Sequence, residues 1–197
     1  MKNRIVLLSV VFAFILFAST AGSAGKSSGT KSAGAGLPKD IASEMKEAKD
    51  MPKGTYTKVK FYEAETLMHG PNTGYEQADA SASGKKSWGA NAGKNQQGYL
   101  IYGPYEELKE GRYIAFFRVK LLGSAGEEPV VTIDACVDQG QGVLDQRAVT
   151  GDDLAKDKYV QVPLLFEYES GELETRVFWQ GGVSILVDCI TVFKLTK

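Results

Sequence analysis

The sequence predicts an all-β sandwich, and three observations carry that prediction. From about Tyr56 onward, short runs rich in valine, isoleucine, tyrosine and phenylalanine alternate with glycine-bearing turns, at the spacing typical of a sandwich or barrel. No helical periodicity of any length follows Met51. The 22 glycines, nine tyrosines and nine phenylalanines fit strands joined by tight turns.

The apolar runs place the strands along the chain. Glycine, aspartate and serine punctuate them, as at Gly111, Asp152 and Gly171. The predicted strands are Thr57–Glu63, Glu76–Ala82, Gly98–Tyr102, Arg112–Leu121, Pro129–Val137, Leu144–Val149, Tyr159–Tyr168, Leu173–Trp179 and Ser184–Leu195.

The N-terminus predicts export. Lys2 and Arg4 form a basic head, Ile5 to Ala18 is an uncharged apolar run, and small residues follow up to Ala24. This order is that of a secretory signal peptide, here residues 1–24. The alternative is an uncleaved anchor, but the run is short for a membrane span of about 20 residues. We therefore expect cleavage, no membrane insertion afterwards, and a secreted or periplasmic protein.

Residues 25–55 are predicted to be a flexible linker that contains a short helix. Gly25 to Leu37 is made almost wholly of small and polar residues, which bury little apolar surface. The polar segment Lys39–Asp50 carries only a thin apolar stripe, led by Ile41 and Met45, so its helix needs docking to be stable. The β domain is then residues 56–197.

The charge content bears on the partner class, and the cysteine content bears on disulfide formation. With 23 lysines and arginines against 24 aspartates and glutamates, there is no electrostatic case for a nucleic-acid partner. Cys136 and Cys189 both fall in strand-like runs. In an exported protein they form either a disulfide or two buried thiols, and both alternatives stay open.

Three carboxylates lie in unusual places. Val59 and Phe61 define an apolar face of the first predicted strand, and Glu63 and Glu65 continue on that face. Carboxylates on the core side of a strand are costly unless they are paired or bind a metal. The alternative is that both glutamates lie beyond the strand end, in solvent.

The last predicted strand repeats this anomaly. Leu186, Asp188, Ile190 and Val192 share one face of a strand that is apolar on both sides. If the first and last strands are neighbours, the three carboxylates converge, and oxygen ligands of this kind suit calcium.

The inventory of reactive residues argues against an enzyme. His69 is the only histidine, the sequence has no Gly-x-Ser-x-Gly elbow, and a catalytic zinc site normally needs several histidines or cysteines. Two carboxylates suffice for a glycosidase, so a small hydrolase or lyase remains the least favoured alternative.

Several motifs together resemble a known family. They are Tyr62-Glu63-Ala64-Glu65, Tyr99-Leu100 with Tyr102-Gly103-Pro104-Tyr105, Gly111-Arg112-Tyr113 leading to Phe117-Arg118-Val119, and Val187-Asp188-Cys189-Ile190-Thr191-Val192. Their order and spacing resemble carbohydrate-binding modules of families six and thirty-five. The resemblance covers roughly Phe61 to Leu195 and implies the galactose-binding-like jelly-roll fold.

The resemblance also implies sites. The family's early glutamate pair and late aspartate hold a structural calcium ion, which implies Glu63, Glu65 and Asp188 as ligands here. The family binds sugar in loops at one end of the sandwich, through aromatic rings and an asparagine. The residues of this kind are Trp88, Asn91, Tyr75, Tyr99 and Trp179. For Trp88 and Trp179, packing on the sandwich is the alternative role.

The sequence therefore predicts an exported, non-catalytic carbohydrate-binding protein with a structural calcium site. Its partner would be a poly- or oligosaccharide. The alternative is a structural or adhesion module of the cell envelope or matrix, which would bind another envelope or matrix protein instead of sugar.

Overall fold

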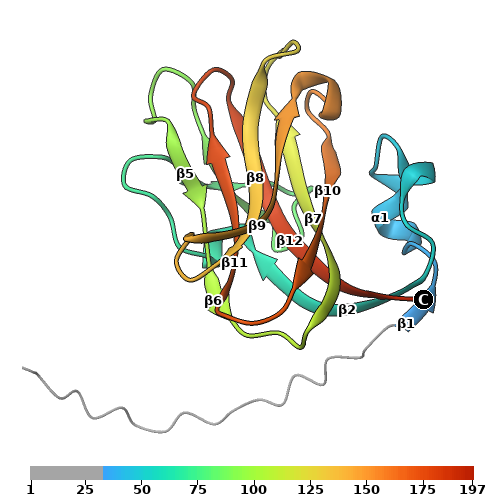
Figure 1. Cartoon of the computed structure of the whole chain (residues 1–197). Helices are drawn as coiled ribbons and strands as arrows, with labels where there is room; N and C mark the ends of the chain where they lie inside the picture. Colours follow the sequence, from blue (N-terminus) through green and yellow to red (C-terminus); the bar gives the residue numbers. More distant parts are fainter. Residues whose placement is uncertain (1–32) are drawn as a thin grey trace, which may run out of the picture. The chain divides into compact units, whose positions relative to one another are not determined.

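The computed structural model describes residues 33–197, and these form a two-sheet antiparallel β-sandwich (Figure 1). The predicted fold class is confirmed. The predicted signal peptide, residues 1–24, lies outside the described residues. Within residues 33–197, no helix is both long and apolar enough to cross a membrane.

The larger sheet has seven strands, of which β12 is the hub. The order is β1-β2-β12-β4-β3, with β7 also paired to β12 and β10 to β7. Its members are β1 (Ala33–Ala35), β2 (Thr55–Glu63), β3 (Tyr75–Ala78), β4 (Lys86–Ala90), β7 (Gly111–Leu121), β10 (Tyr159–Tyr168) and β12 (Ile185–Thr196).

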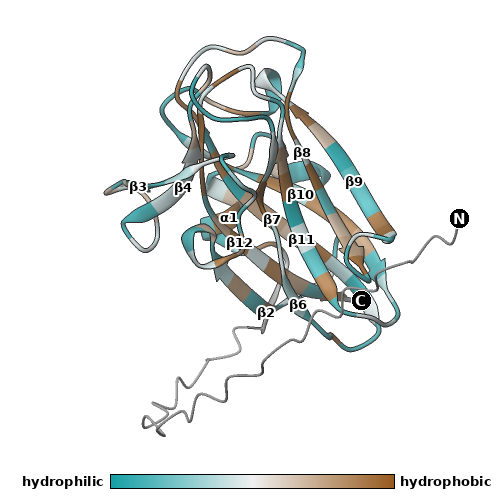
Figure 2. Cartoon of the chain, turned by 90° about the vertical axis from the view of Figure 1, so that its left-hand side faces the viewer, coloured by the Kyte–Doolittle hydropathy of each residue, from teal (hydrophilic) through white to brown (hydrophobic). Residues whose placement is uncertain are grey.

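The smaller sheet has five strands. Its order is β5-β11-β8-β9, and β6 also pairs with β11. Its members are β5 (Gly98–Ile101), β6 (Pro104–Glu106), β8 (Pro129–Val137), β9 (Gly142–Thr150) and β11 (Leu173–Trp179). Hydrophilic and hydrophobic bands alternate along β9 and β11 in Figure 2, as expected for strands with one face on the core.

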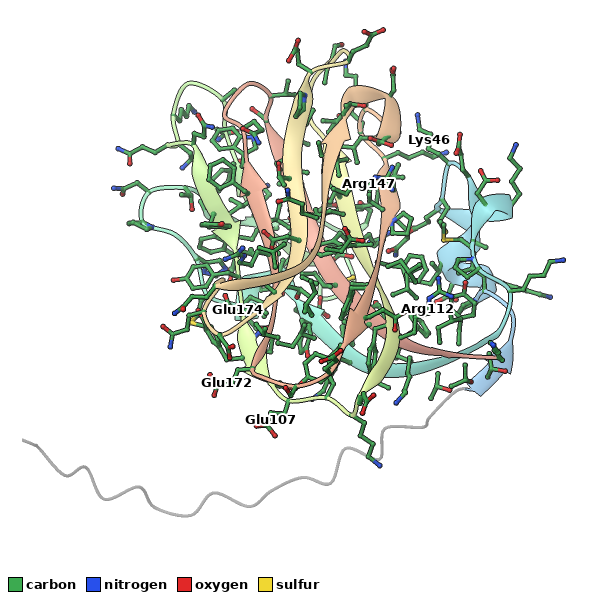
Figure 3. The ribbon with its side chains drawn as sticks, viewed as in Figure 1. Lys46, Glu107, Arg112, Arg147, Glu172 and Glu174 are labelled. Carbon is green, nitrogen blue, oxygen red and sulfur yellow. The ribbon has the colours of Figure 1, made fainter. Side chains whose placement is uncertain are left out.

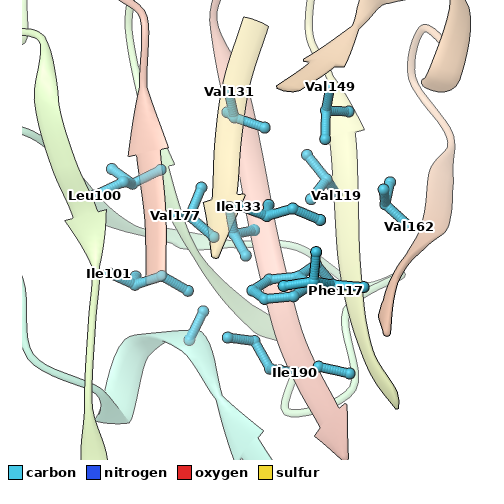
Figure 4. Packing of buried hydrophobic residues seen from close by; sticks show 14 of the residues in the cluster. Leu100, Ile101, Phe117, Val119, Val131, Ile133, Val149, Val162, Val177 and Ile190 are labelled. Carbon is cyan, nitrogen blue, oxygen red and sulfur yellow. The ribbon is translucent and has the colours of Figure 1, made fainter. Parts of the chain in front are cut away.

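The main core lies between the two sheets. Side chains from both sheets meet there, as Figure 4 shows for Phe117, Val119, Ile133, Val177 and Ile190. Because successive strand residues point to opposite faces, each of these strands contributes every second residue to this layer.

Strand β12 changes partners at Asp188, on the side opposite β7. Before that point Val187 pairs with Trp88 of β4, and after it Cys189 pairs with Glu63 of β2. On the β7 side, the two residues Asp188 and Cys189 lie opposite the single residue Arg118, which defines a β-bulge.

Two predictions about strand faces are wrong. Asp188 does not share a face with Ile190 and Val192, which lie in the core, because the extra residue shifts the alternation. Val59 and Phe61 do not face the core either, since both are exposed. The Glu63 face is therefore the outer face of the seven-stranded sheet.

Residues 37–51, here called the strap, pack on this outer face instead of forming a free linker. They contain the predicted short helix, α1 (Lys39–Ser43), and a 3₁₀ turn at Ala48–Asp50. Ile41 is buried against an aromatic cluster of Tyr56, Phe116 and Phe193. The predicted flexible linker is thus wrong for its later part, and β1 pairs with β2 just before the strap.

The structure shows two buried thiols and no disulfide between the two cysteines of the described chain. Cys136 lies in β8 of one sheet and Cys189 in β12 of the other, and both are buried and free. Burial raises the pKa of Cys136 to about 12, so this thiol stays protonated near neutral pH. The disulfide alternative is therefore wrong, and the two cysteines act as small apolar residues.

Candidate functional site

The five predicted sugar-binding residues do not form one site. Trp88 pairs directly with Val187, a core residue, so Trp88 points to the inner face of the sheet. Tyr75 pairs with the next residue, Gly89, and therefore lies on the opposite, outer face. Tyr75 and Trp88 thus cannot stack on the same sugar ring.

Trp88 is a packed strand residue and not a loop platform, so the prediction for it is wrong. It lies in β4, packs against the core, and stacks on His69 with ring centroids 3.4 Å apart and planes 10° apart. His69 Nε2 lies 3.0 Å from the carbonyl oxygen of Ala64, and burial lowers the pKa of His69. One face of the indole is therefore covered by an imidazole that is neutral near pH 7.

Trp179 is fully buried, which also contradicts its predicted role. Its indole Nε1 donates a hydrogen bond of 2.8 Å to the carbonyl oxygen of Val183, and its ring belongs to the main core. It holds the turn between β11 and β12 and offers no surface to a ligand.

Asn91 shapes a loop at the end of the sandwich. Its backbone N–H donates to Asn95 Oδ1 at 2.8 Å, and its carbonyl accepts from the N–H groups of Lys94 and Asn95. The next residue, Ala92, donates to Ser184 Oγ. The turn is therefore organised by the backbone of Asn91 and the side chain of Asn95.

Tyr99 is the predicted residue that the structure presents as a platform. Its ring is 37% exposed and lies over the guanidinium of Arg176, 4.7 Å from the ring centroid to Cζ. Phe178 meets the same ring edge-on, with centroids 5.2 Å apart. Next along these strands, Gln97 Nε2 donates to Gln180 Oε1 at 3.1 Å. We call Tyr99, Phe178, Arg176, Gln97 and Gln180 the Tyr99 platform.

A buried ion pair supports the platform from below. Arg176 makes two hydrogen bonds to Asp134, Nε to Oδ1 at 2.7 Å and Nη2 to Oδ2 at 3.0 Å. This fork fixes the guanidinium plane on which Tyr99 rests. The backbone of Gly140 lies close against this guanidinium, and a side chain would not fit there, because a Cβ would lie 2.2 Å from Arg176 Nη1.

Glu174, labelled in Figure 3, lies in β11 two residues before Arg176 and therefore on the same face of the strand. Its side chain is buried, and its Oε1 has no hydrogen-bond partner among residues 33–197. Burial raises the pKa of Glu174, while nearby Arg176 and Tyr105 oppose that rise. The carboxyl group therefore ionises less readily than an exposed glutamate.

The predicted calcium ligands do come close together, at the point where β12 changes partners. Ser83 joins them: its Oγ donates to Glu63 and its backbone N–H donates to Asp188 Oδ1 at 2.9 Å. A Cβ at Gly84 would lie 3.1 Å from Glu65 Oε1 and 3.5 Å from Glu63 Oε1. The predicted convergence is thus explained by the partner switch and by the loop before β4.

Glu63 and Glu65 offer carboxylate oxygens, the kind of donor that hard divalent cations take. Glu65 Oε2 is buried without a hydrogen-bond partner in the described chain. Burial raises the pKa of Glu63, and the nearby Asp188 and Glu65 charges add to the rise. A cation would relieve both effects.

Asp188 has other partners. Its Oδ2 accepts from Arg118 Nη1 at 2.5 Å, and Ser83 occupies its Oδ1. Residues 33–197 contain no group of three or more histidine, cysteine, aspartate or glutamate side chains arranged to hold a metal. Calcium would have to displace part of this network to use Asp188 as a ligand.

Sequence reasoning missed most of the platform. Arg176 and Phe178 alternate with core residues along β11, and Gln180 follows at the same spacing just after its end, so a period-2 reading of Leu173–Trp179 places them on the outer face. That strand was predicted with its observed bounds, so the sequence did indicate which of its residues share a face. The sequence did not indicate that β11 pairs with β5, which brings Tyr99 beside Phe178.

Comparison with solved structures assigns the fold. The C-terminal family six module of LamC, a laminarinase of Zobellia galactanivorans, matches with a TM-score of 0.52 and 14% identity, over 68% of this chain and 98% of that module. A family six module of Cellvibrio mixtus lichenase 5A gives 0.49 and 12% identity, over 71% of this chain and 99% of that one.

A family thirty-five module of Clostridium thermocellum gives a TM-score of 0.48 and 18% identity, over 68% of this chain and 98% of that one. No family model and no curated protein sequence matches the chain. The fold is therefore that of the carbohydrate-binding modules of family six, as the sequence resemblance implied.

Proposed function

We propose that this protein is an exported, non-catalytic carbohydrate-binding protein that binds a poly- or oligosaccharide at the Tyr99 platform. One observation carries the proposal: a partly exposed tyrosine ring is held on a fixed guanidinium, with two amides beside it. Sugar rings present C–H faces that pack on aromatic rings, while amides bond their hydroxyl groups. The shared fold supports this ligand class.

Two further parts of the proposal rest on separate arguments. Export is supported by the basic, apolar and small-residue segments of residues 1–24. A structural calcium ion is supported by the buried, unpartnered Glu65 oxygen beside Glu63. Such an ion would stabilise the protein by binding only its folded form.

Affinity electrophoresis of the full chain through gels that contain soluble polysaccharides tests the binding. Retardation in one gel should be lost in Tyr99→Ala and kept in Tyr75→Ala, a matched tyrosine outside the platform. If no gel retards the folded protein, sugar binding is wrong and the envelope or matrix adhesion role takes its place. If both variants bind normally, sugar is bound elsewhere.

A further inference from the structure

A pocket of about 390 Å³ lies between the strap and the outer face of the seven-stranded sheet. Ile41 and Glu44 of the strap form one wall, Phe61 of β2 the rim, and Arg118 and Gln161 of β7 and β10 part of the floor. Its volume is in the range of small-molecule sites. It shares no residue with the Tyr99 platform, whose strands belong to the other sheet.

An unpartnered group is buried in the lining of this pocket. Gln161 is only 5% exposed, and its Oε1 has no hydrogen-bond partner among residues 33–197. The other end of the amide is fixed, because Nε2 points to Glu44 Oε2 at 3.4 Å and the Gln161 backbone N–H donates to the Glu44 carbonyl at 3.0 Å. The carbonyl oxygen of this amide is therefore an acceptor that a donor from water or from a bound molecule can fill.

The charges in the pocket disfavour an anion. Arg118 gives four hydrogen bonds to protein oxygens, two of them to Glu44 and one each to Asp188 and Ser81. A guanidinium has five N–H donors, so little of its capacity is left for a ligand. The lining also holds Lys58, so two cations with Arg118 stand against the three carboxylates of Asp40, Glu44 and Asp188, and this excess repels negative charge.

The remaining features select an uncharged ligand with an apolar face. Phe61 is 42% exposed at the rim beside the polar floor, and the Lys58 ammonium lies 5.2 Å from the centroid of its ring. Ser43 and Ser83 contribute hydroxyl oxygens that can accept hydrogen bonds, because their O–H groups already donate to the Asp40 carbonyl and to Glu63. A molecule that fits these features carries hydroxyl donors on a ring with a C–H face.

We infer that the strap pocket is a second binding site, for one or two residues of an uncharged sugar. Its aromatic contact is Phe61 and its hydroxyl-binding groups are Gln161 and Glu44. The ligand class is that of the proposed function but the site is separate, so either site can fail alone. Two sites on opposite sheets would let one protein hold two chains, or two points of one chain, with a gain in avidity.

The side-chain amide resonance of Gln161 in the ¹⁵N-labelled full chain gives a direct readout. Gln161→Met identifies the resonance, because it removes that signal while the backbone contact to Glu44 remains. The probes are glucose, galactose, xylose and cellobiose, with glucuronate as the charged comparison. We expect a saturable shift with at least one uncharged probe and none with glucuronate.

Two matched variants decide the location. Phe61→Ala should weaken the affinity for that probe about tenfold, as expected for loss of an aromatic contact. Val59→Ala, an exposed change in the same strand, and Tyr99→Ala, in the other site, should leave it unchanged. A shift abolished by Tyr99→Ala but not by Phe61→Ala, an equal response to glucuronate, or no shift with any probe would each overturn the inference. The last result would mean that the pocket holds water only.

Discussion

Asp188 and Arg118 face each other across the β-bulge of β12, with Arg118 Nη1 2.5 Å from Asp188 Oδ2. Arg118 also holds Glu44 of the strap through two hydrogen bonds of 2.7 and 2.6 Å. One guanidinium therefore connects the strap, the bulge and the loop before β4. Asp188 is fully buried, so these partners supply the hydrogen bonds that water would give an exposed carboxylate.

Asp188→Asn should lower the free energy of unfolding by about 3–5 kcal/mol, because it leaves part of a buried charge network without its partner. Urea unfolding monitored by circular dichroism measures this. The matched control is Glu106→Gln, which breaks the more exposed pair between Lys60 and Glu106 and should cost no more than about 1 kcal/mol. Equal small losses would show that Asp188 is not buried in solution.

Calcium removal should destabilise the protein. At calcium concentrations near 100 times Kd, binding contributes about 2.7 kcal/mol, and chelator should remove this. Differential scanning fluorimetry should then show Tm falling by roughly 5–10 °C. Glu65→Gln should abolish the response to chelator, whereas Glu76→Gln, an exposed carboxylate paired with Lys86, should keep it. A chelator-insensitive wild type would refute the calcium site.

Trp179→Ala should act on stability. Loss of this fully buried indole and of its hydrogen bond to Val183 should cost about 3–5 kcal/mol in urea unfolding. Tyr99→Ala, which changes an exposed ring, should cost about 1 kcal/mol or less. The reverse ranking would mean that the indole is the exposed platform and the tyrosine the core residue.

The strap should behave as part of the domain. Ile41→Ala should lower the free energy of unfolding by about 2–4 kcal/mol, since Ile41 is buried on Phe116 and Phe193. Met68→Ala, at an exposed methionine, is the control and should change little. If the two variants are equally stable, the strap does not dock in solution.

Glu174 should make stability fall as the pH rises. Its pKa in the folded state is raised by burial, so its contribution is fully present below the ordinary glutamate value and is lost as the pH rises through the folded pKa. The glutamine of Glu174→Gln cannot ionise. The Tm of this variant minus the Tm of the wild type should therefore be larger at pH 8 than at pH 4. Calorimetry at both values measures this, with Glu172→Gln as an exposed control. A constant difference would contradict a raised pKa.

The sequence was sufficient for the fold class and for most strands. Pro129–Val137, Tyr159–Tyr168 and Leu173–Trp179 were predicted with their observed bounds, because long β-branched and aromatic runs between glycines leave few alternatives. Strand β4 was missed and treated as loop, since Lys86–Ala90 has three small residues and one tryptophan. Its pairing with β12, not its own propensity, makes it a strand.

The site was less predictable because it depends on register. A one-residue bulge at Asp188 reverses the assignment of faces beyond it, and nothing in the composition of β12 marks the bulge. The convergence of Glu63, Glu65 and Asp188 was still anticipated, because it requires only that the first and last predicted strands be neighbours. The Tyr99 platform required knowledge of which strand lies beside β11.

The position of β12 also governs when the protein can fold. It is the last strand of the described chain, yet it lies at the centre of its sheet and pairs with β2, β4 and β7. A nascent chain that lacks this strand has no hub on which those three can assemble. The seven-stranded sheet must therefore close after β12 has been synthesised, through contacts of long sequence separation, which is typical of slow folding.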